Sequence, residues 1–220
     1  MTKTTAKDGV TAEQHLDESL RRMKTDCLDL WQVHSLKDPT DVDLRIEQGV
    51  LEVFERAKAS GKTRYIGFTG HNSPWAHLRM LERSDVFDAV QMPVNCADPS
   101  FESFVLNVLP ELGTREMGVL AMKTLSNGVF FGGDKQFMYG SNPLLVPERV
   151  SIREAVTYAW SHPISVLITG ADDAGQMREK IQMARSVELL DEDGKQDLVD
   201  RVSDRAGNIV EFYKQVVTPA

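Results

Sequence analysis

Short apolar segments alternate with longer segments of helical periodicity along the whole chain. The apolar segments are too short for helices and predict buried strands, whereas apolar residues at three- and four-residue spacing predict helices with one buried face. The predicted strands lie at residues 27–34, 64–69, 87–92, 118–122 and 165–168. The predicted helices lie at residues 12–23, 43–59, 100–112, 151–161, 172–184 and 192–214, with one more that opens at Ser73 and Pro74.

Local signals mark where several of these helices begin. Thr11–Gln14 and Ser151–Glu154 have the capping-box pattern, and Ser73 is a typical N-cap. The stretch 126–147 holds four glycines and two prolines without periodicity, so we expect a long loop there. A loop of that length inside a compact domain is usually functional.

Strands separated by helices predict right-handed βαβ units and a parallel sheet. Two architectures have this order: the closed (β/α)8 barrel and the doubly wound open sheet. No GxGxxG or GxxxxGK[ST] motif follows a strand, so the chain lacks the strongest signal for the dinucleotide- or phosphate-binding loop of a doubly wound sheet. No repeat or linker interrupts residues 1–220, so we expect one domain. In either architecture ligands bind at the carboxyl ends of the strands, where the chain has Lys3, His34 and residues 69–71, 91–95, 122–125 and 169–172.

The chain is acidic, with 25 basic and 33 acidic residues, a net charge of −8 and an isoelectric point near 5.2. This argues against a surface for nucleic acid or anionic lipid, and no apolar run is long enough to span a bilayer. The first residues contain no apolar leader, so we expect a cytoplasmic protein. Cys27 and Cys96 form no CxxC pair, which predicts two buried free thiols and no metal site.

Several blocks of sequence resemble the aldo-keto reductase family. Residues 19–34 read SLRRMKTDCLDLWQVH, similar to the family's helix end, Thr-Asp pair and strand that ends in a histidine. Residues 61–69 read GKTRYIGFT, similar to its Gly-Lys-x-Arg-x-Ile-Gly-x-Ser strand, and residues 118–125 resemble its Gly-Val-x-Ala-Tyr-x-Pro-Leu segment. Residues 1–4 resemble the strand that supplies the family's catalytic lysine, and Gln91 falls where its strand-six glutamine lies.

The resemblance implies an incomplete (β/α)8 barrel of about six parallel strands with outer helices. The family's barrel has eight strands, and its first two strands have no counterpart here, as in a chain shortened at its N-terminus. The family's catalytic group consists of Tyr, Lys, Asp and His. Lys3 and His34 match its lysine and histidine, whereas its Asp and Tyr have no counterpart.

The family's reaction is hydride transfer from a reduced nicotinamide to the carbonyl carbon of an aldehyde or ketone. The tyrosine protonates the developing alkoxide, the lysine lowers the pKa of that tyrosine, and the histidine orients the carbonyl oxygen. His34 suits the last role, and an ordinary histidine pKa near 6.5 would also let it donate a proton. Without the tyrosine we expect an impaired oxidoreductase. No positioned substitute is apparent among the chain's tyrosines, which are Tyr65, Tyr139, Tyr158 and Tyr213.

The cofactor that the resemblance implies is NADP or NAD. The carboxamide of the nicotinamide would be held by Thr69, Gly70 and Gln91, with Met122 in place of the family's aromatic ring. Asp172 and its neighbour Asp173 disfavour a 2′-phosphate and suit a ribose hydroxyl, although a helix that begins there offers backbone amides to an anion. The remaining implied cofactor residues are Lys123, Thr124 and Leu125 along the pyrophosphate, and Gly170, Ala171, Gln176 and Glu179 around the adenosine.

Two functions of different classes fit these features. One is an NAD(P)H-dependent reductase of small aldehydes or ketones, which the family resemblance favours. The other is a catalytically inactive nucleotide-binding or scaffolding protein on the same fold, which the absent Tyr and Asp favour. A parallel sheet with two open edges also predicts self-association through those edges.

Overall fold

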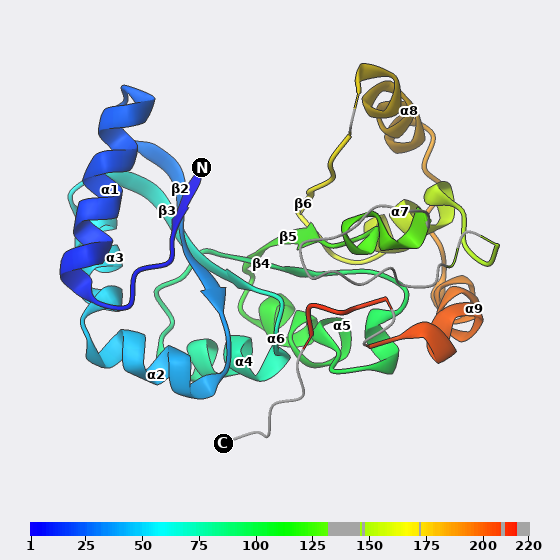
Figure 1. Ribbon diagram of the computed structural model, residues 1–220, viewed down its shortest axis with the longest axis horizontal. Helices are drawn as coiled ribbons and strands as arrows, with labels where there is room; N and C mark the ends of the chain where they lie inside the picture. The colour runs from blue at the N-terminus through cyan, green and yellow to red at the C-terminus, as the bar shows by residue number, and fades with distance from the viewer. Residues whose placement is uncertain (132–145, 147, 172, 208–209, 215–220) are drawn as a thin grey trace. The chain divides into compact units, whose positions relative to one another are not determined.

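The computed structural model describes residues 1–131, 146, 148–171, 173–207 and 210–214 (Figure 1). Strands and helices alternate along these residues, which confirms the predicted α/β order. The strands are β1 (Thr2–Thr4), β2 (Leu28–Leu36), β3 (Thr63–Gly70), β4 (Ala89–Pro93), β5 (Gly118–Met122) and β6 (Val166–Leu167). The helices are α1 (Gly9–Met23), α2 (Pro39–Glu47), α3 (Val50–Ala59), α4 (Pro74–Arg83), α5 (Phe104–Asn107), α6 (Leu109–Thr114), α7 (Ile152–Trp160), α8 (Ala174–Arg185) and α9 (Glu192–Val202).

The six strands form one sheet in which the strand order is the chain order, from β1 to β6. The pairs β1–β2, β2–β3, β3–β4 and β5–β6 are parallel, as expected for strands joined by helices. Among the described residues no pairing returns from β6 to β1, so the row of strands is not closed. This arrangement confirms an incomplete barrel of six parallel strands with outer helices.

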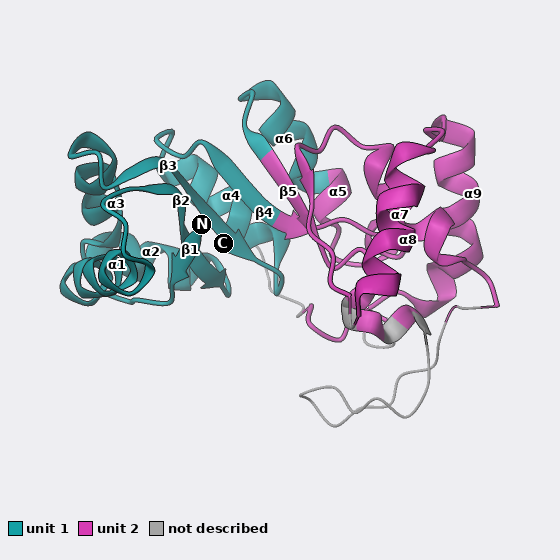
Figure 2. Ribbon diagram, turned by 90° about the horizontal axis from the view of Figure 1, so that it is seen from above, with its two compact units in different colours: residues 1–91, 107–118, 215–220 teal, residues 92–106, 119–214 magenta. Residues whose placement is uncertain are grey.

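The chain divides into two compact units, which Figure 2 shows in different colours. Unit 1 comprises residues 1–91, 107–118 and 215–220, and unit 2 comprises residues 92–106 and 119–214. Among the described residues the chain therefore passes between the units inside β4, inside α5 and at the start of β5. The expectation of one domain over residues 1–220 stays a prediction.

Unit 1 is organised around β2 and β3 and the helices that pack on them. Trp31 of β2 is fully buried and stacks on Phe54 of α3, with ring centroids 3.7 Å apart. Burial of each of these rings contributes about 1.5–3 kcal/mol to the stability of the fold. Gly67 of β3 lies so close to β4 that an added Cβ would stand 2.4 Å from the carbonyl oxygen of Ala89. Only glycine therefore fits at this position.

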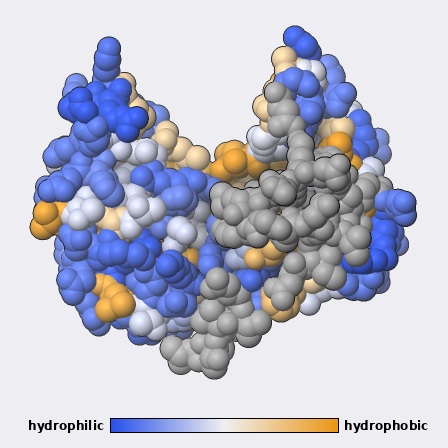
Figure 3. All heavy atoms as spheres, viewed as in Figure 1, coloured by the Kyte–Doolittle hydropathy of each residue, from blue (hydrophilic) through white to orange (hydrophobic). Residues whose placement is uncertain are grey.

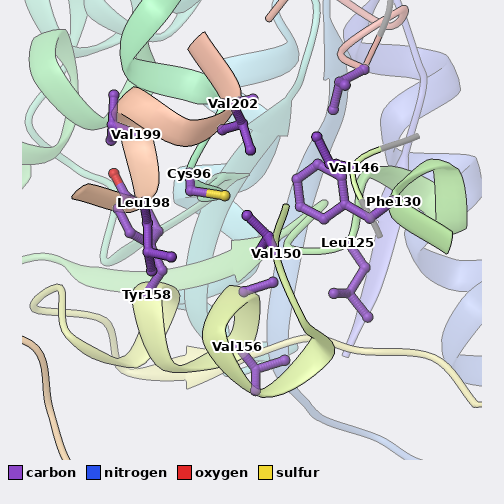
Figure 4. Packing of buried hydrophobic residues seen from close by; sticks show 13 residues of the cluster. Cys96, Leu125, Phe130, Val146, Val150, Val156, Tyr158, Leu198, Val199 and Val202 are labelled. Carbon is purple, nitrogen blue, oxygen red and sulfur yellow. The ribbon is translucent and has the colours of Figure 1, made fainter. Parts of the chain in front are cut away.

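Unit 2 has its own hydrophobic core, which joins segments far apart in the sequence (Figure 4). Tyr158 of α7, Leu198 of α9 and Cys96 of the segment after β4 all belong to it. Burial raises the pKa of the Cys96 thiol to about 12, so this cysteine is the neutral buried thiol that the sequence predicts. Cys27 is also free, but it is only partly buried, which corrects the prediction.

Two predicted helices are interrupted in the structure. The segment 43–59 forms the separate helices α2 and α3 because Gly49 between them has a left-handed φ of +82°. The segment 100–112 forms α5 and α6 instead of one helix. The Asp98 carboxylate accepts hydrogen bonds from the backbone N–H groups of α5 and fixes its start, and Pro110 in the first turn of α6 lacks the N–H that would continue α5.

The ends of three other elements differ from the prediction. The first helix begins at Gly9 with Asp8 as its N-cap, which accepts from the N–H of Thr11 at 2.8 Å, so the proposed cap at Thr11 is wrong. The last helix ends at Val202, well before residue 214, and β6 keeps two of the four predicted strand residues. The caps at Ser151 and Ser73 are confirmed.

The predicted loop at 126–147 begins with a 3₁₀ helix, Ser126–Phe131, and most of its remainder lies outside the described residues. The face seen in Figure 3 is mostly hydrophilic, with scattered apolar positions. Within the part of the chain that the structure describes, no helix combines the length and the apolar character needed to cross a membrane.

Candidate active site

The strand register of unit 1 places a row of polar side chains on one face of the sheet. Lys3 of β1 is opposite Gln32 of β2, and Thr69 of β3 is opposite Gln91 of β4. Residues opposite each other in parallel strands point to the same side, and neighbours along a strand point to opposite sides. Because Trp31 points to α3, the adjacent Gln32 points away from it. We call the face that carries Lys3, Gln32, Thr69 and Gln91 the open face of unit 1.

His34 lies two residues beyond Gln32, near the carboxyl end of β2, and it is partly buried. Burial lowers the pKa of its imidazole, and the charges of Lys3 and Arg45 lower it further. The strand register also places these two predicted catalytic residues near each other, because Lys3 is opposite Gln32 and His34 lies two residues further along β2. At neutral pH the ring is therefore uncharged, so it can donate one hydrogen bond and accept another.

Lys3 is half-buried, and burial lowers the pKa of its ammonium group. None of the carboxylates in the described part of the chain forms an ion pair with it. The family's catalytic lysine is paired with an Asp, which has no counterpart in this sequence. The structure thus brings Lys3 and His34 together but supplies neither of the other two catalytic groups within unit 1.

A β-bulge lies in β2 at His34. Val33 is opposite Phe68 and Leu36 is opposite Gly70, so β2 has one more residue than β3 between these pairs. Ser35 within this segment has a left-handed φ of +60°. Bulges redirect side chains and are frequent beside active sites. The sequence gives no signal for this bulge, because neither glycine nor asparagine marks the left-handed position.

Thr69, Gly70 and Gln91, which the resemblance assigns to the nicotinamide carboxamide, lie together at the carboxyl ends of β3 and β4. Thr69 and Gln91 are buried polar residues on the open face. At Gly70 an added Cβ would stand 2.7 Å from the carbonyl oxygen of Leu36 and 3.0 Å from the ring of His77. No side chain fits there, so only the backbone of Gly70 is able to contact a ligand.

Within unit 1 the described residues supply no phenol at His34. Tyr65 shares the face of Thr69 but lies four residues earlier on β3, roughly 13 Å along the strand, and it is 56% exposed. Tyr158 and Tyr213 belong to unit 2, and burial raises the pKa of each phenol. Tyr158 is in α7 as expected, whereas Tyr213 lies beyond the last helix. Tyr139 is outside the described residues.

In unit 2, the predicted pyrophosphate residues follow β5 directly. Lys123 has a left-handed φ of +59°, and its ammonium lies 5.2 Å from the centre of the Tyr213 ring. Thr124 is 2% exposed, and its hydroxyl has no hydrogen-bond partner in the described part of the chain. Leu125 is buried and Met122 is partly buried. A buried, unsatisfied hydroxyl beside a lysine suits an oxygen-rich anion.

The predicted adenosine residues lie around the start of α8. Gly170 and Ala171 precede this helix, and Gln176 and Glu179 are exposed on it. Its N-cap is Asp173, which accepts from the N–H of Gln176 at 2.9 Å, whereas Asp172 is outside the described residues. One of the backbone N–H groups at the start of α8, where we expected an anion, thus already donates to a side chain.

Lys180 of α8 turns back toward the segment after β6. Its ammonium donates to the hydroxyl of Thr169 at 3.0 Å and to the carbonyl of Gly170. These two oxygens of the segment after β6 therefore bind the Lys180 ammonium. For metals, no group of three or more His, Cys, Asp or Glu side chains able to hold an ion occurs among the described residues.

Comparisons with known proteins agree on one family. The sequence model of the Aldo/keto reductase family matches residues 3–167. The uncharacterized oxidoreductase YqkF of Bacillus subtilis is 25% identical over 201 residues, which are 83% of this chain and 63% of that protein. The chain thus spans less than two thirds of the length of this relative.

Solved structures show the same fold. An aldo-keto reductase from Bacillus halodurans in its holo form superposes with a TM-score of 0.70 at 19% identity, over 90% of this chain and 70% of that one. A glycerol dehydrogenase from Gluconobacter oxydans gives a TM-score of 0.65 at 20% identity, over 98% of this chain and 68% of that one. At such low identity these two structures show the fold alone.

Proposed function

The chain belongs to the aldo/keto reductase family, and from this premise we propose that it is an NAD(P)H-dependent oxidoreductase of small aldehydes or ketones with impaired catalysis. The observation that carries the proposal is the strand register of unit 1, which places Lys3 opposite Gln32 of β2, two residues before His34. The expected cytoplasmic location fits two free cysteines.

Each unit, taken by itself, has residues that suit a part of a nicotinamide nucleotide. Buried Thr69 and Gln91 offer polar atoms to the carboxamide, together with the backbone of Gly70. In unit 2 the unsatisfied hydroxyl of Thr124 and the ammonium of Lys123 suit phosphate oxygens. When bound in its reduced form, the nicotinamide supplies the hydride that the carbonyl carbon receives.

The role of His34 is to hold the carbonyl oxygen. Its neutral ring donates a hydrogen bond to that oxygen, and the ammonium of Lys3 stabilises the negative charge that develops there. The alkoxide also needs a proton, which His34 or Lys3 gives in place of the absent tyrosine. A missing positioned acid typically lowers the rate by about 10²–10⁴-fold, so we expect slow turnover.

The adenosine end of the proposed site does not select NADP. Exposed Gln176 and Glu179 stand on α8, and its N-cap is the acidic Asp173. A carboxylate there repels a 2′-phosphate and accepts a hydrogen bond from a ribose hydroxyl. NADH is therefore expected to bind at least as tightly as NADPH, which titration with each nucleotide would measure.

Turnover assays of the 220-residue chain test this function. NADH and NADPH are each offered with a panel of small aldehydes and ketones, and absorbance at 340 nm is followed. We expect slow oxidation that His34→Ala abolishes and that Tyr65→Phe, the matched control far along β3, leaves unchanged. Oxidation that survives His34→Ala contradicts the proposed role of His34.

The second candidate function is nucleotide binding without catalysis. The absence of a phenol near His34 among the described residues of unit 1 favours it. Binding of NADH or NADPH measured by fluorescence, with no turnover of any carbonyl compound, would establish it and overturn the reductase. Self-association through the strands at the two ends of the row stays part of the proposal, and light scattering of the purified chain tests it.

A further inference from the structure

Helix α2 carries a buried cation that the catalytic group does not include. The side chain of Arg45 is 2% exposed, and a guanidinium has five N–H donors. Its Nε and Nη2 bind the carboxylate of Asp41 at 3.1 and 3.0 Å. The remaining donors reach the backbone carbonyls of His34, Ser35 and Ala6 at 3.1, 3.3 and 3.4 Å. Five acceptors therefore match five donors.

These three carbonyls belong to the two segments that carry the candidate catalytic residues. Ala6 lies three residues after Lys3, just past the end of β1. His34 and Ser35 form the bulge of β2. One guanidinium thus fixes the backbone that follows Lys3 and the backbone of His34 itself.

The bulge needs such support. A left-handed φ is strained at a residue other than glycine, and Ser35 adopts it at +60°. Arg45 binds the carbonyls of Ser35 and of the residue before it, which compensates for this strain. Because the bulge determines where the His34 side chain points, Arg45 acts on that direction through the backbone.

Asp41 neutralises the buried guanidinium and is itself well bound. Lys7 pairs with its carboxylate, and the N–H of Lys37 donates to it at 3.1 Å. Burial alone would raise the pKa of Asp41, but the hydrogen bonds from Arg45 and Lys7 outweigh burial and lower it. The carboxylate therefore stays ionised beside Arg45 at neutral pH.

We propose that Arg45 is a positioning residue that sets the direction of the His34 ring relative to Lys3 by binding the carbonyls of His34, Ser35 and Ala6. The proposal rests on the proposed function, since that function makes the direction of the ring matter. Arg45 itself touches neither substrate nor cofactor in this role.

Two variants separate position from charge. Arg45→Lys keeps the positive charge but cannot reach three carbonyls and a carboxylate, because an ammonium has three donors on one nitrogen. Arg45→Gln removes the charge as well. The measurements are the His34 imidazole pKa and the Ser35 backbone signals by NMR, and kcat and KM per folded molecule. Arg79→Lys is the matched control. The guanidinium of Arg79 on α4 donates to the carboxylate of Asp43 on α2 at 3.0 Å, and neither residue belongs to the bulge.

We expect Arg45→Lys to lower kcat by about 10- to 100-fold, to change KM little and to shift the Ser35 signals, while the His34 pKa stays low. Arg45→Gln is expected to raise the His34 pKa, because the repulsion of the imidazolium by Arg45 is lost. Arg79→Lys is expected to change none of these.

A merely structural role would lower the folded fraction of both variants and leave kcat per folded molecule and the Ser35 signals unchanged. That result overturns the proposal. Absence of turnover in the unsubstituted chain overturns the proposed function instead, and the NMR measurements then decide the positioning role alone. Unchanged Ser35 signals in Arg45→Lys, or an unchanged His34 pKa in Arg45→Gln, would count against it.

Discussion

The two units bury charge in different ways. In unit 1 the Arg45 guanidinium has an acceptor for each donor, and Asp41 is its carboxylate. In unit 2 the fully buried ammonium of Lys214 pairs with two fully buried carboxylates, Asp98 at 2.7 Å and Glu211 at 2.9 Å. One oxygen of Glu211 has no hydrogen-bond partner among the described residues. The unit 2 cluster therefore contains one negative charge more than it can neutralise.

This difference shows what each cluster is able to do as pH changes. The Asp41–Arg45 pair has one negative and one positive charge, so it keeps the bulge at His34 in one geometry over a wide pH range. At Glu211 burial raises the pKa to about 7, although Lys214 opposes the shift. The cluster that anchors the residues 210–214 consequently changes its charge near neutral pH.

The largest expected effect is that of Lys214→Met. It leaves Asp98 and Glu211 buried without their cation, which should lower the free energy of unfolding by about 3–5 kcal/mol in urea titrations. Lys195→Met is the control, because Lys195 pairs with Glu192, which is 90% exposed, and should lose less than about 1 kcal/mol. Equal losses in the two variants would show that the unit 2 cluster is not a special source of stability.

A second prediction concerns His77, which is fully buried in unit 1. Burial lowers its pKa to about 4, so the unfolded chain takes up this proton at a higher pH than the folded chain. The free energy of unfolding should therefore fall by roughly 3 kcal/mol as pH decreases from about 6.5 toward 4. Urea unfolding of His77→Phe across this range should show a smaller slope. His162, whose pKa burial lowers to about 4, and His34, whose pKa burial also lowers, contribute to the slope that remains. An unchanged slope contradicts this assignment.

Glu211 should give the opposite sign. Its folded pKa is above that of an unfolded glutamate, so the folded chain holds a proton that the unfolded chain has released between about pH 4.5 and 7. Stability from this group is lost as pH rises through that window. Glu211→Gln, which stays neutral, should be more stable than the unsubstituted chain at pH 8 by about 2 kcal/mol. A variant that is less stable at pH 8 would mean that the ionised carboxylate stabilises the cluster.

The smallest expected effect belongs to Gln32 on the open face of unit 1. It is fully buried, and neither its amide nitrogen nor its amide oxygen has a hydrogen-bond partner in the described chain. Gln32→Leu should therefore raise the free energy of unfolding by about 0–1 kcal/mol, and exposed Gln14→Leu should leave it unchanged. A loss above about 1 kcal/mol would show that the amide is bonded in the folded protein. A fall in turnover without a loss of stability would connect it with the reaction.

The sequence predicts the fold better than the boundaries of its elements. Periodicity finds five of the six strands and most helices because one buried face imposes a spacing on the residues, whereas β1 is found through the family resemblance. It misses the break at Gly49, since one glycine within a helical pattern is usually tolerated. It also extends the last helix too far, since Tyr213 and Lys214 are buried in unit 2 beyond the end of α9.

The candidate site is predictable where it rests on single residues at strand ends. Lys3, His34, Thr69 and Gln91 are found in this way. Arg45 is not, because it acts on backbone carbonyls 10 to 39 residues away in the chain, and no local pattern reports such contacts. The bulge itself depends on the register between two strands, which a single sequence does not specify.

Helix α8 has no fully buried side chain, and its Met183 packs only partly buried against the core of unit 2. Its opening therefore needs little free energy, and its amides should exchange with deuterium long before those of α3. Because Gln176 and Glu179 stand on this helix, a bound nucleotide would slow that exchange. Deuterium exchange of the α8 amides thus reports whether a nucleotide is bound, without any need for catalytic turnover.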